Sequence, residues 1–262
     1  MLNSKTPFID LTWIEQAQSK SNRLNCLSQH SREILEYDGF RWVSSPDGAI
    51  QSMISLDDHA YPVLHYVKAL LCSLVFVQHP KKLLNLGLGS GAIERFVISL
   101  PHQIQTVSIE PEVDMISLSK ECFFLDTDYP VREETAELFF SENRQQFDII
   151  ICDIHPKQGD INPIQNDLFL QDIEKSLTSK GVAAINFLPE NSDDIVKMLV
   201  RLRHTFSWVI VFDVPAQQNV VLYCSNSQYP DKTDLQSRAM MPDFYSLEAE
   251  TICSQLVWLP HQ

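Results

Sequence analysis

The chain has 262 residues, and a hydrophobic fraction of 44% is large enough for a substantial core, which excludes a disordered polymer. Its 20 Lys and Arg residues against 34 Asp and Glu residues give a net charge of −14. This argues against a general nucleic-acid binder, because such proteins need a basic face to neutralise phosphates. Only 7 residues are glycine, and three of them, Gly87, Gly89 and Gly91, fall within five positions.

The N-terminal part of the chain combines one helical pattern with β-like runs. The pattern predicts a helix over residues 11–27. Two β-like runs then flank Asp38-Gly39, which is typical of a hairpin turn because glycine accepts a positive φ at no steric cost. A second turn signal at 46–48 leads into a third run. We therefore expect a small antiparallel sheet of two or three strands over 33–55.

Beyond this sheet, a helix is predicted over 60–77, and from residue 81 strand and helix patterns alternate. The predicted strands are 83–86, 104–109, 147–153, 182–187, 208–214 and 219–224, and the predicted helices are 91–100, 112–125, 135–143, 167–177 and 193–204. Lys180-Gly181 is interpreted as the closing signal of the helix over 167–177. Repeated βα units are typical of a parallel sheet covered by helices on both faces, and the last two strands predict an antiparallel pair.

Targeting and redox signals are sparse. Residues 1–6 contain no long apolar stretch, and the longest apolar run, 69–77, is far shorter than the about 20 residues that span a bilayer. The six cysteines are scattered, without CxxC pairs or histidines at zinc-finger spacing. We therefore expect reduced core thiols, no metal site, no membrane contact and a cytoplasmic location.

The glycine cluster lies between a predicted strand and a predicted helix. Glycine lets the backbone turn sharply and approach a ligand, and the helix that begins near Gly91 offers free N–H groups. The next strand ends at Glu110, 19 residues after Gly91, where an acid usually accepts hydrogen bonds from ribose hydroxyls. These features predict a nucleoside-binding site. The alternative is a tight strand–helix turn with a solvated glutamate.

The cluster reads GxGxG, whereas the dinucleotide fingerprint is GxGxxG. Together with the final antiparallel pair, this resembles the class I S-adenosylmethionine-dependent methyltransferase fold. The resemblance implies an α/β, Rossmann-like, seven-stranded, mostly parallel sheet with an antiparallel last strand, preceded here by the small N-terminal antiparallel β-sheet. We expect an N-terminal segment with a small β-hairpin domain over 1–60, a nucleoside-binding catalytic domain over 61–225, and a C-terminal tail over 226–262.

Further motifs narrow the resemblance. They are Gln51–Asp58, His65-Tyr66, Pro80–Leu83, Arg95, Val107–Val113, Ser119–Phe123, Phe147–Asp153 and Lys180–Val182. Across residues 34–225 this combination resembles the polyamine aminopropyltransferase family, and in particular a divergent spermidine synthase-like branch.

The resemblance implies transfer of an aminopropyl group from decarboxylated S-adenosylmethionine to an amine acceptor such as putrescine. The sulfonium is a good leaving group, so such an enzyme mainly positions its two substrates, and a carboxylate keeps the attacking amine deprotonated and aimed. The positions matched to the family's site are Gly87, Gly89, Ser90, Gly91, Glu110, Thr135 and Ala136 for the nucleoside, and Gln51 and Tyr66 for the acceptor.

Two of these nucleoside positions depart from the family. Its glycine loop carries an acid that helps to hold cationic substrates, where this chain has Ser90. The family's acidic dipeptide beside the adenine is matched by Thr135-Ala136, and Glu133 or Glu134 would replace the acid only in a shifted register.

A third departure falls in the loop after the strand over 147–153. Asp153 supplies the first of the family's two acids, but the second, catalytic acid is matched by Pro156. His155 is the candidate base near neutral pH, and the alternative is an ordinary surface histidine. Asp160 and Asp167, on or just after this loop, are candidates for partial compensation. The predicted catalytic residues are therefore Asp153 and His155.

Three functions follow as alternatives. The first is an aminopropyltransferase-like enzyme with a degenerate catalytic loop and a small, polyamine-like amine acceptor. The second is a methyltransferase that uses S-adenosylmethionine itself, and the third is a non-catalytic nucleoside-binding or structural homologue. The resemblance also implies a homodimer.

Overall fold

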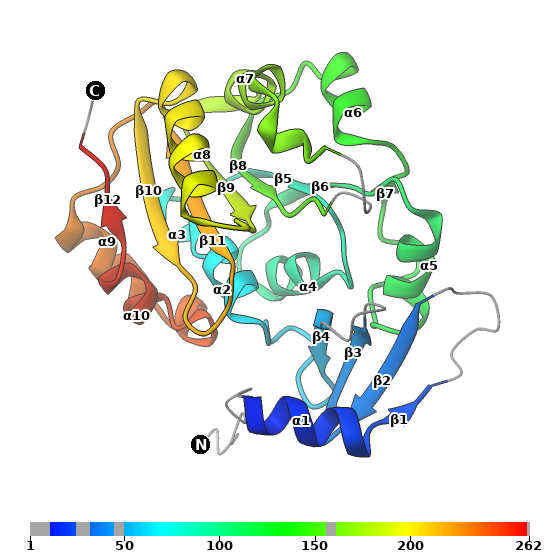
Figure 1. Cartoon of the computed structure of the whole chain (residues 1–262). Helices are drawn as coiled ribbons and strands as arrows, with labels where there is room; N and C mark the ends of the chain where they lie inside the picture. The colour runs from blue at the N-terminus through cyan, green and yellow to red at the C-terminus, as the bar shows by residue number, and fades with distance from the viewer. Residues whose placement is uncertain (1–10, 25–31, 45–49, 156–160, 261–262) are drawn as a thin grey trace.

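The computed structural model describes residues 11–24, 32–44, 50–155 and 161–260 (Figure 1). A small antiparallel sheet lies at one end of the molecule, beside a larger α/β unit onto which the C-terminal helices pack (Figure 1). The turn predicted at 46–48, together with Pro156 and Asp160, lies outside the described residues.

The small sheet has the strand order β1-β2-β3-β4. Its strands are β1 (Asn22–Arg23), β2 (Glu33–Tyr37), β3 (Phe40–Ser44) and β4 (Ile50–Ser55), and helix α1 (Leu11–Lys20) precedes them. Asp38 and Gly39 both have positive φ, 51° and 78°, as a tight β2–β3 hairpin with the strands' right-handed twist requires. The predicted hairpin is confirmed. The helix predicted over 11–27 is too long, because the chain leaves it after Lys20 to pair β1 with β2.

The larger sheet has the order β12-β10-β11-β9-β8-β5-β6-β7. Its strands are β5 (Lys82–Leu86), β6 (Gln105–Ile109), β7 (Val131–Arg132), β8 (Phe147–Cys152), β9 (Leu177–Phe187), β10 (Trp208–Asp213), β11 (Val220–Ser225) and β12 (Val257–Trp258). Strands β5 to β9 are parallel, and β11 is antiparallel to both β9 and β10. This confirms the mostly parallel sheet with an antiparallel last strand. The short β12, which pairs with β10, adds an eighth strand to the described sheet.

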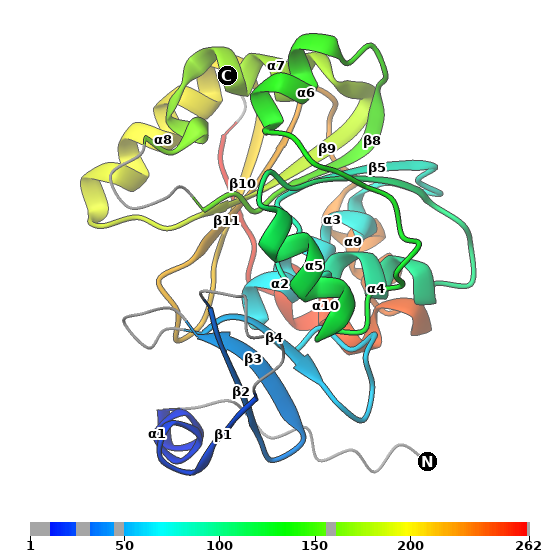
Figure 2. The same ribbon diagram turned by 90° about the vertical axis from the view of Figure 1, so that its right-hand side faces the viewer.

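Helices cover both faces of this sheet (Figure 2). They are α2 (His65–Leu71), α3 (Ser73–Phe76), α4 (Ala92–Ser99), α5 (Val113–Glu121), α6 (Ala136–Glu142), α7 (Asp167–Lys175), α8 (Ser192–Thr205), α9 (Lys232–Ala239) and α10 (Ala249–Ser254), with 3₁₀ turns η1 (Pro163–Gln165) and η2 (Pro242–Leu247). Successive strand residues point to opposite faces. Ile149 and Ile151 therefore pack with α2, α3 and α4, whereas Ile150 packs with α6, α7 and α8. The continuous apolar run in β8 is explained by this burial on two sides.

Two local predictions are corrected. The helix predicted over 60–77 begins only at His65 and is divided at Cys72 into α2 and α3. Gly181 does not close a helix, because α7 ends at Lys175 and Gly181 lies within β9. A Cβ atom on Gly181 would lie 2.9 Å from the carbonyl oxygen of Phe147, so glycine is needed here for close strand packing.

The buried residues of α9, η2 and α10 pack in the same core cluster as α2 and α3, whereas Leu259 packs on the other face of the sheet. Lys68, which is 3% exposed, forms an ion pair with Glu248, and its Nζ donates to the Tyr61 hydroxyl at 2.8 Å. Within the described ranges no helix is long and apolar enough to cross a membrane. The five described cysteines are all free and buried.

The contact at Gly181 predicts a local stability effect. Gly181→Ala should lower the free energy of unfolding by about 1–3 kcal/mol, because the new methyl group must displace the Phe147 backbone or the Leu177 side chain. Urea unfolding measures this, with Ser179→Ala at an exposed position of the same strand as the control. Equal midpoints for the two variants would contradict the packing role.

Candidate functional site

The candidate site lies where the direction of the sheet's connections reverses. Strand β5 lies between β6 and β8, and the chain continues from β5 to β6 on one side and returns to β8 on the other. Such switch points, at the carboxyl ends of parallel strands, form the usual ligand crevice of open α/β sheets. Strands β6, β5 and β8 lie side by side in the sheet (Figure 1). Gly87, Glu110 and Asp153 directly follow β5, β6 and β8, so the topology brings these three predicted residues to one edge.

The glycine loop is held by its own backbone geometry. Gly87, Gly89 and Gly91 have φ values of 95°, 54° and 80°, a region that other residues rarely adopt. A Cβ atom on Gly87 would lie 2.3 Å from the carbonyl oxygen of Asp153, so no side chain fits there. A Cβ on Gly89 would meet only the Ser52 hydroxyl, at 3.5 Å. Gly87 therefore serves backbone packing, whereas the space beside Gly89 is open enough for a ligand to approach.

Ser90 is the buried polar residue of this loop. Its N–H donates to the Ser52 hydroxyl at 3.0 Å, and Arg95 donates to its carbonyl oxygen and, at 2.8 Å, to that of Phe123. Burial lowers the pKa of Arg95 to about 10. The Ser90 hydroxyl is buried and, among the described atoms, has no hydrogen-bond partner. An unsatisfied buried hydroxyl at the loop is consistent with a polar ligand group.

Glu110 is anchored by the backbone. Its Oε2 accepts from the Leu88 N–H at 3.1 Å, and its Oε1 accepts from the Glu112 N–H at 3.0 Å. Burial raises the pKa of Glu110, and these two hydrogen bonds partly offset that rise. An ionised carboxylate has about four acceptor positions, so both oxygens keep capacity for two ribose hydroxyls. The residues present therefore fit a nucleoside.

Asp153 lies at the centre of a polar cluster. Its Oδ1 accepts from Asn186 Nδ2 at 2.7 Å, and Asn219 Nδ2 donates to Asn186 Oδ1 at 2.9 Å. Burial raises the pKa of Tyr66 well above its usual value, and the nearby charge of Asp153 raises it further. Tyr66 thus keeps its proton and donates to the Gln51 carbonyl oxygen at 3.3 Å.

His155 is exposed, and its Nδ1 lies 3.7 Å from Asp153 Oδ1, so an imidazolium there would pair with the carboxylate. The structure thus brings both predicted catalytic residues together. Asp167 instead pairs with Arg201 at 2.5 Å on the exposed side of α7.

The other predicted positions have identifiable local roles. Thr135 is the N-cap of α6, where its Oγ1 accepts from the Leu138 N–H at 3.2 Å, and Ala136 is buried in the core. The Gln51 side chain accepts from Arg32 at 2.8 Å, and Arg32 also pairs with Glu112 at 2.5 Å. Gln51 is thereby connected to the loop that carries Glu110. No described contact links Thr135 or Ala136 to the glycine loop, and their nucleoside role stays a prediction.

Sequence reasoning missed Asn186, Asn219 and Ser52. Asn186 lies near the carboxyl end of β9, at the edge of the sheet where ligands usually bind. A polar residue at that end of a predicted strand could have been recognised from the sequence as a site candidate. Asn219 reaches the site from the residue just before β11, and Ser52 reaches it from β4; no short sequence pattern marks those contacts.

Comparisons with known proteins show which sequences and folds the chain resembles. The sequence matches no family model. It is 25% identical over 158 residues to a polyamine aminopropyltransferase of Chromobacterium violaceum, covering 59% of this chain and 60% of that protein. It is 22% identical over 195 residues to the eEF1A lysine and N-terminal methyltransferase of Xenopus laevis, covering 66% of this chain but 28% of that protein. The chain thus spans less than two thirds of the length of these curated relatives.

Solved structures share the fold. A probable spermidine synthase from Corynebacterium glutamicum matches with a TM-score of 0.65 and 16% identity, over 88% of each chain. Human methyltransferase-like protein 13, in complex with SAH, matches with a TM-score of 0.60 and 20% identity, over 76% of this chain and 95% of that one. The fold is therefore that of class I S-adenosylmethionine-dependent methyltransferases and spermidine synthases, and the predicted resemblance to polyamine aminopropyltransferases is confirmed.

A second buried acid lies behind the glycine loop. Glu94 in α4 is fully buried, and its Oε1 accepts from Asn85 Nδ2 and from the Ser108 hydroxyl, both at 2.7 Å. Its Oε2 has no partner among the described atoms. Burial raises the pKa of Glu94, which these hydrogen bonds only partly offset. Through these hydrogen bonds Glu94 connects α4 to β5 and β6. Because the site is buried, ionisation of Glu94 destabilises the folded chain.

This predicts a pH-dependent stability difference. The pKa of Glu94 is higher in the folded chain than its usual value of 4.5. The contribution of Glu94 to the free energy of unfolding is therefore greatest below pH 4.5, and it is lost as the pH rises through the folded-state pKa. The free energy of unfolding of Glu94→Gln, relative to wild type, should therefore increase with pH over that window. Urea unfolding across the pH range measures it, with exposed Glu121→Gln as control. A pH-independent difference for Glu94→Gln would contradict the prediction.

Proposed function

We propose that the chain is a spermidine synthase-like transferase that binds decarboxylated S-adenosylmethionine at the glycine loop and transfers its aminopropyl group to a small amine. The observation that carries this proposal is the convergence of Gly87, Glu110 and Asp153 at the switch point of the sheet. Both curated relatives are transferases by name, and the solved relatives include a spermidine synthase in complex with the transition-state analogue AdoDATO.

The nucleoside would lie along the glycine loop. Glu110 is fixed by two backbone N–H groups with acceptor capacity toward the crevice, and it would hold the ribose hydroxyls. The Ser90 hydroxyl offers a further polar contact without charge. Bound here, the sulfonium nucleoside supplies an activated carbon and a neutral thioether leaving group.

The acceptor amine would be aligned by Asp153. Asn186 holds this carboxylate in place, and Tyr66 remains protonated beside it, so the carboxylate is the local acceptor for an amine N–H. As the new carbon–nitrogen bond forms and the carbon–sulfur bond breaks, one amine proton is lost. In this proposal His155, which is exposed and whose Nδ1 lies 3.7 Å from Asp153 Oδ1, passes that proton to solvent. We also propose that the enzyme is cytoplasmic, as the scattered cysteines suggest, and that it acts as a homodimer, as the resemblance implies.

Methyl transfer from S-adenosylmethionine is the second candidate. It is favoured by Ser90, a neutral residue where the polyamine enzymes have an acid, and by the fold shared with human methyltransferase-like protein 13. S-adenosylmethionine carries a carboxylate, which an acid in the loop would repel but the neutral Ser90 does not. Decarboxylated S-adenosylmethionine is purely cationic, and without that acid it loses a favourable charge interaction.

Nucleoside binding is tested with methylthioadenosine, which both candidate reactions accommodate. Glu110→Ala should weaken its affinity about tenfold or more, because hydrogen bonds to a charged group contribute about 1.5–3 kcal/mol. Isothermal titration calorimetry measures the affinity, with exposed Glu121→Ala as the matched acid control. Wild-type protein that binds no nucleoside at millimolar concentration would exclude both transferase candidates.

Turnover separates the alternatives. With decarboxylated S-adenosylmethionine and putrescine, Asp153→Asn should lower kcat about 100-fold while methylthioadenosine still binds, because the amide keeps the shape but not the charge of the carboxylate. His155→Asn should change mainly the pH profile of kcat. Product analysis by mass spectrometry identifies the transferred group.

Methylated product from S-adenosylmethionine, without aminopropyl transfer, would establish the second candidate instead. Nucleoside binding without turnover of any amine would leave a non-catalytic homologue.

A further inference from the structure

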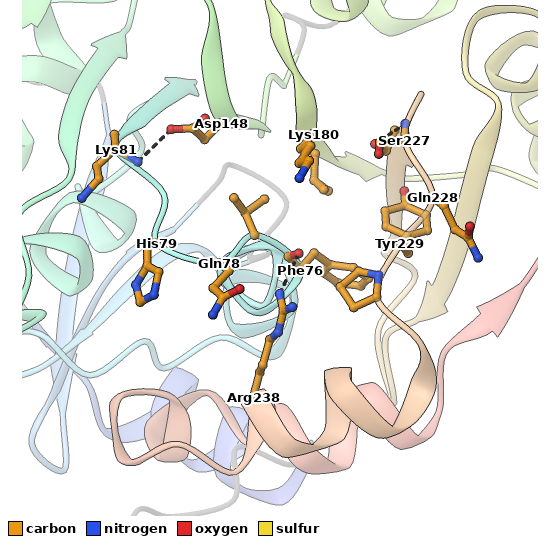
Figure 3. A pocket seen from close by; sticks show the side chains of 14 residues that line it. Phe76, Gln78, His79, Lys81, Asp148, Lys180, Ser227, Gln228, Tyr229 and Arg238 are labelled. Carbon is orange, nitrogen blue, oxygen red and sulfur yellow. Dashed lines mark hydrogen bonds between the residues drawn. The ribbon is translucent and has the colours of Figure 1, made fainter.

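A separate hollow lies at the opposite edge of the sheet, where the parallel strands begin (Figure 3). Its volume is about 520 Å³. Its walls come from the segment between α3 and β5, the start of β8, the first half of β9, the chain after β11, and α9. Since Glu110 and Asp153 follow their strands whereas Lys81 and Asp148 precede or begin theirs, the hollow is remote from the candidate functional site.

The walls carry an excess of positive charge. Lys81, Lys180 and Arg238 line the hollow together with His79, and Asp148 is the acid among the lining residues. Counting also Asp234, which pairs with Arg238, the local charge is +1 without the histidine, from three cations and two acids, in a chain whose net charge is −14. Figure 3 shows that these cations come from different walls, with Arg238 across the hollow from Lys180.

Asp148 does not neutralise the lysines through their side chains. Its Oδ2 accepts from the backbone N–H groups of Lys81 and Lys82 at 2.8 and 3.1 Å, and its Oδ1 accepts from the Thr178 hydroxyl at 3.1 Å. Across the described ranges, no ion pair joins the Lys81 or Lys180 ammonium group to an acid. Both ammonium groups are therefore available to a ligand.

Arg238 is held in position before any ligand binds. Its Nη2 pairs with Asp234 at 2.6 Å, and its Nη1 donates to the Phe76 carbonyl oxygen at 3.2 Å. The Phe76 and Tyr229 rings pack edge to face, with centroids 5.2 Å apart, and both line the hollow. A guanidinium with five donors in fixed positions suits the oxygens of a phosphate group.

We propose that this hollow is a second ligand site, which binds a small phosphorylated anion with at least two negative charges. A singly charged carboxylate would engage one wall, whereas a di- or polyphosphate has charge enough to pair with both Lys180 and Arg238, which lie across the hollow from each other (Figure 3). Its binding would connect the beginnings of β5, β8 and β9 to α9. The site is independent of the proposed transferase function.

Inorganic tripolyphosphate is the probe, because it lacks a nucleoside and has no group for the glycine loop. Isothermal titration calorimetry at low salt compares the wild type with Lys81→Gln/Lys180→Gln. The matched control is Lys20→Gln/Lys197→Gln, which removes two exposed lysines elsewhere and gives the same net charge of −16. We expect about a tenfold or larger loss of affinity in the first double variant and less than about a twofold change in the control.

Several outcomes would overturn the proposal. These are no binding to the wild type at millimolar tripolyphosphate, equal losses in the two double variants, or loss of binding when methylthioadenosine saturates the protein. Matching melting temperatures for the two double variants would show that both are folded.

Discussion

The contact between the backbones of Gly87 and Asp153 sets the geometry of the candidate site. A side chain at Gly87 would collide with the Asp153 carbonyl oxygen at 2.3 Å, so the ends of β5 and β8 can meet only through glycine. Two hydrogen bonds complete the junction, from the Gly87 N–H to the Ile109 carbonyl at 3.0 Å and from the Asp153 N–H to the Leu86 carbonyl at 2.8 Å. Three strand ends are thereby fixed together. The Glu110 and Asp153 carboxylates then lie at the same edge of the sheet, although they are 43 positions apart in the chain.

The charged groups at this edge of the sheet are few, and each is held by hydrogen bonds. Asp153 is held by the amide of Asn186 and lies beside the protonated Tyr66, and Glu110 is held by backbone N–H groups. At Ser90 the loop offers a neutral hydroxyl. Burying a cation is costly unless an opposite charge faces it, so such a site accommodates one ammonium group more easily than two. The net charge of −14 therefore belongs mainly to the solvated surface and is no evidence for a polycationic substrate.

The sequence was informative wherever a local pattern decided the structure. Asp38-Gly39 predicts the hairpin because two positive φ values are needed there, and alternating strands and helices predict the sheet. The prediction for Gly181 is wrong because the local sequence is the same in two cases. A glycine that follows a helical pattern can end the helix, or it can lie in the next strand where a neighbouring backbone packs closely, as it does here. The two-residue β12 depends on pairing with β10, more than 40 residues earlier, and has no pattern of its own. The contact of Asn219 with Asn186 likewise depends on how β9 and β11 pair.

The two edges of the sheet are joined by the same strands, which bears on whether their sites communicate. β9 and β11 run antiparallel, so the Ser225 hydroxyl contacts the Gly181 carbonyl at 2.9 Å near the cationic hollow, while Asn219 contacts Asn186 at 2.9 Å near Asp153. Between these contacts the ladder is continuous from Ala183 paired with Cys224 to Phe187 paired with Val220, and its residues are buried. Coupling between distant sites requires an element with two arrangements that both ligands bias. A close-packed, fully paired ladder provides a single arrangement, so an anion in the hollow should leave nucleoside affinity unchanged, and by thermodynamic reciprocity the nucleoside should leave anion affinity unchanged.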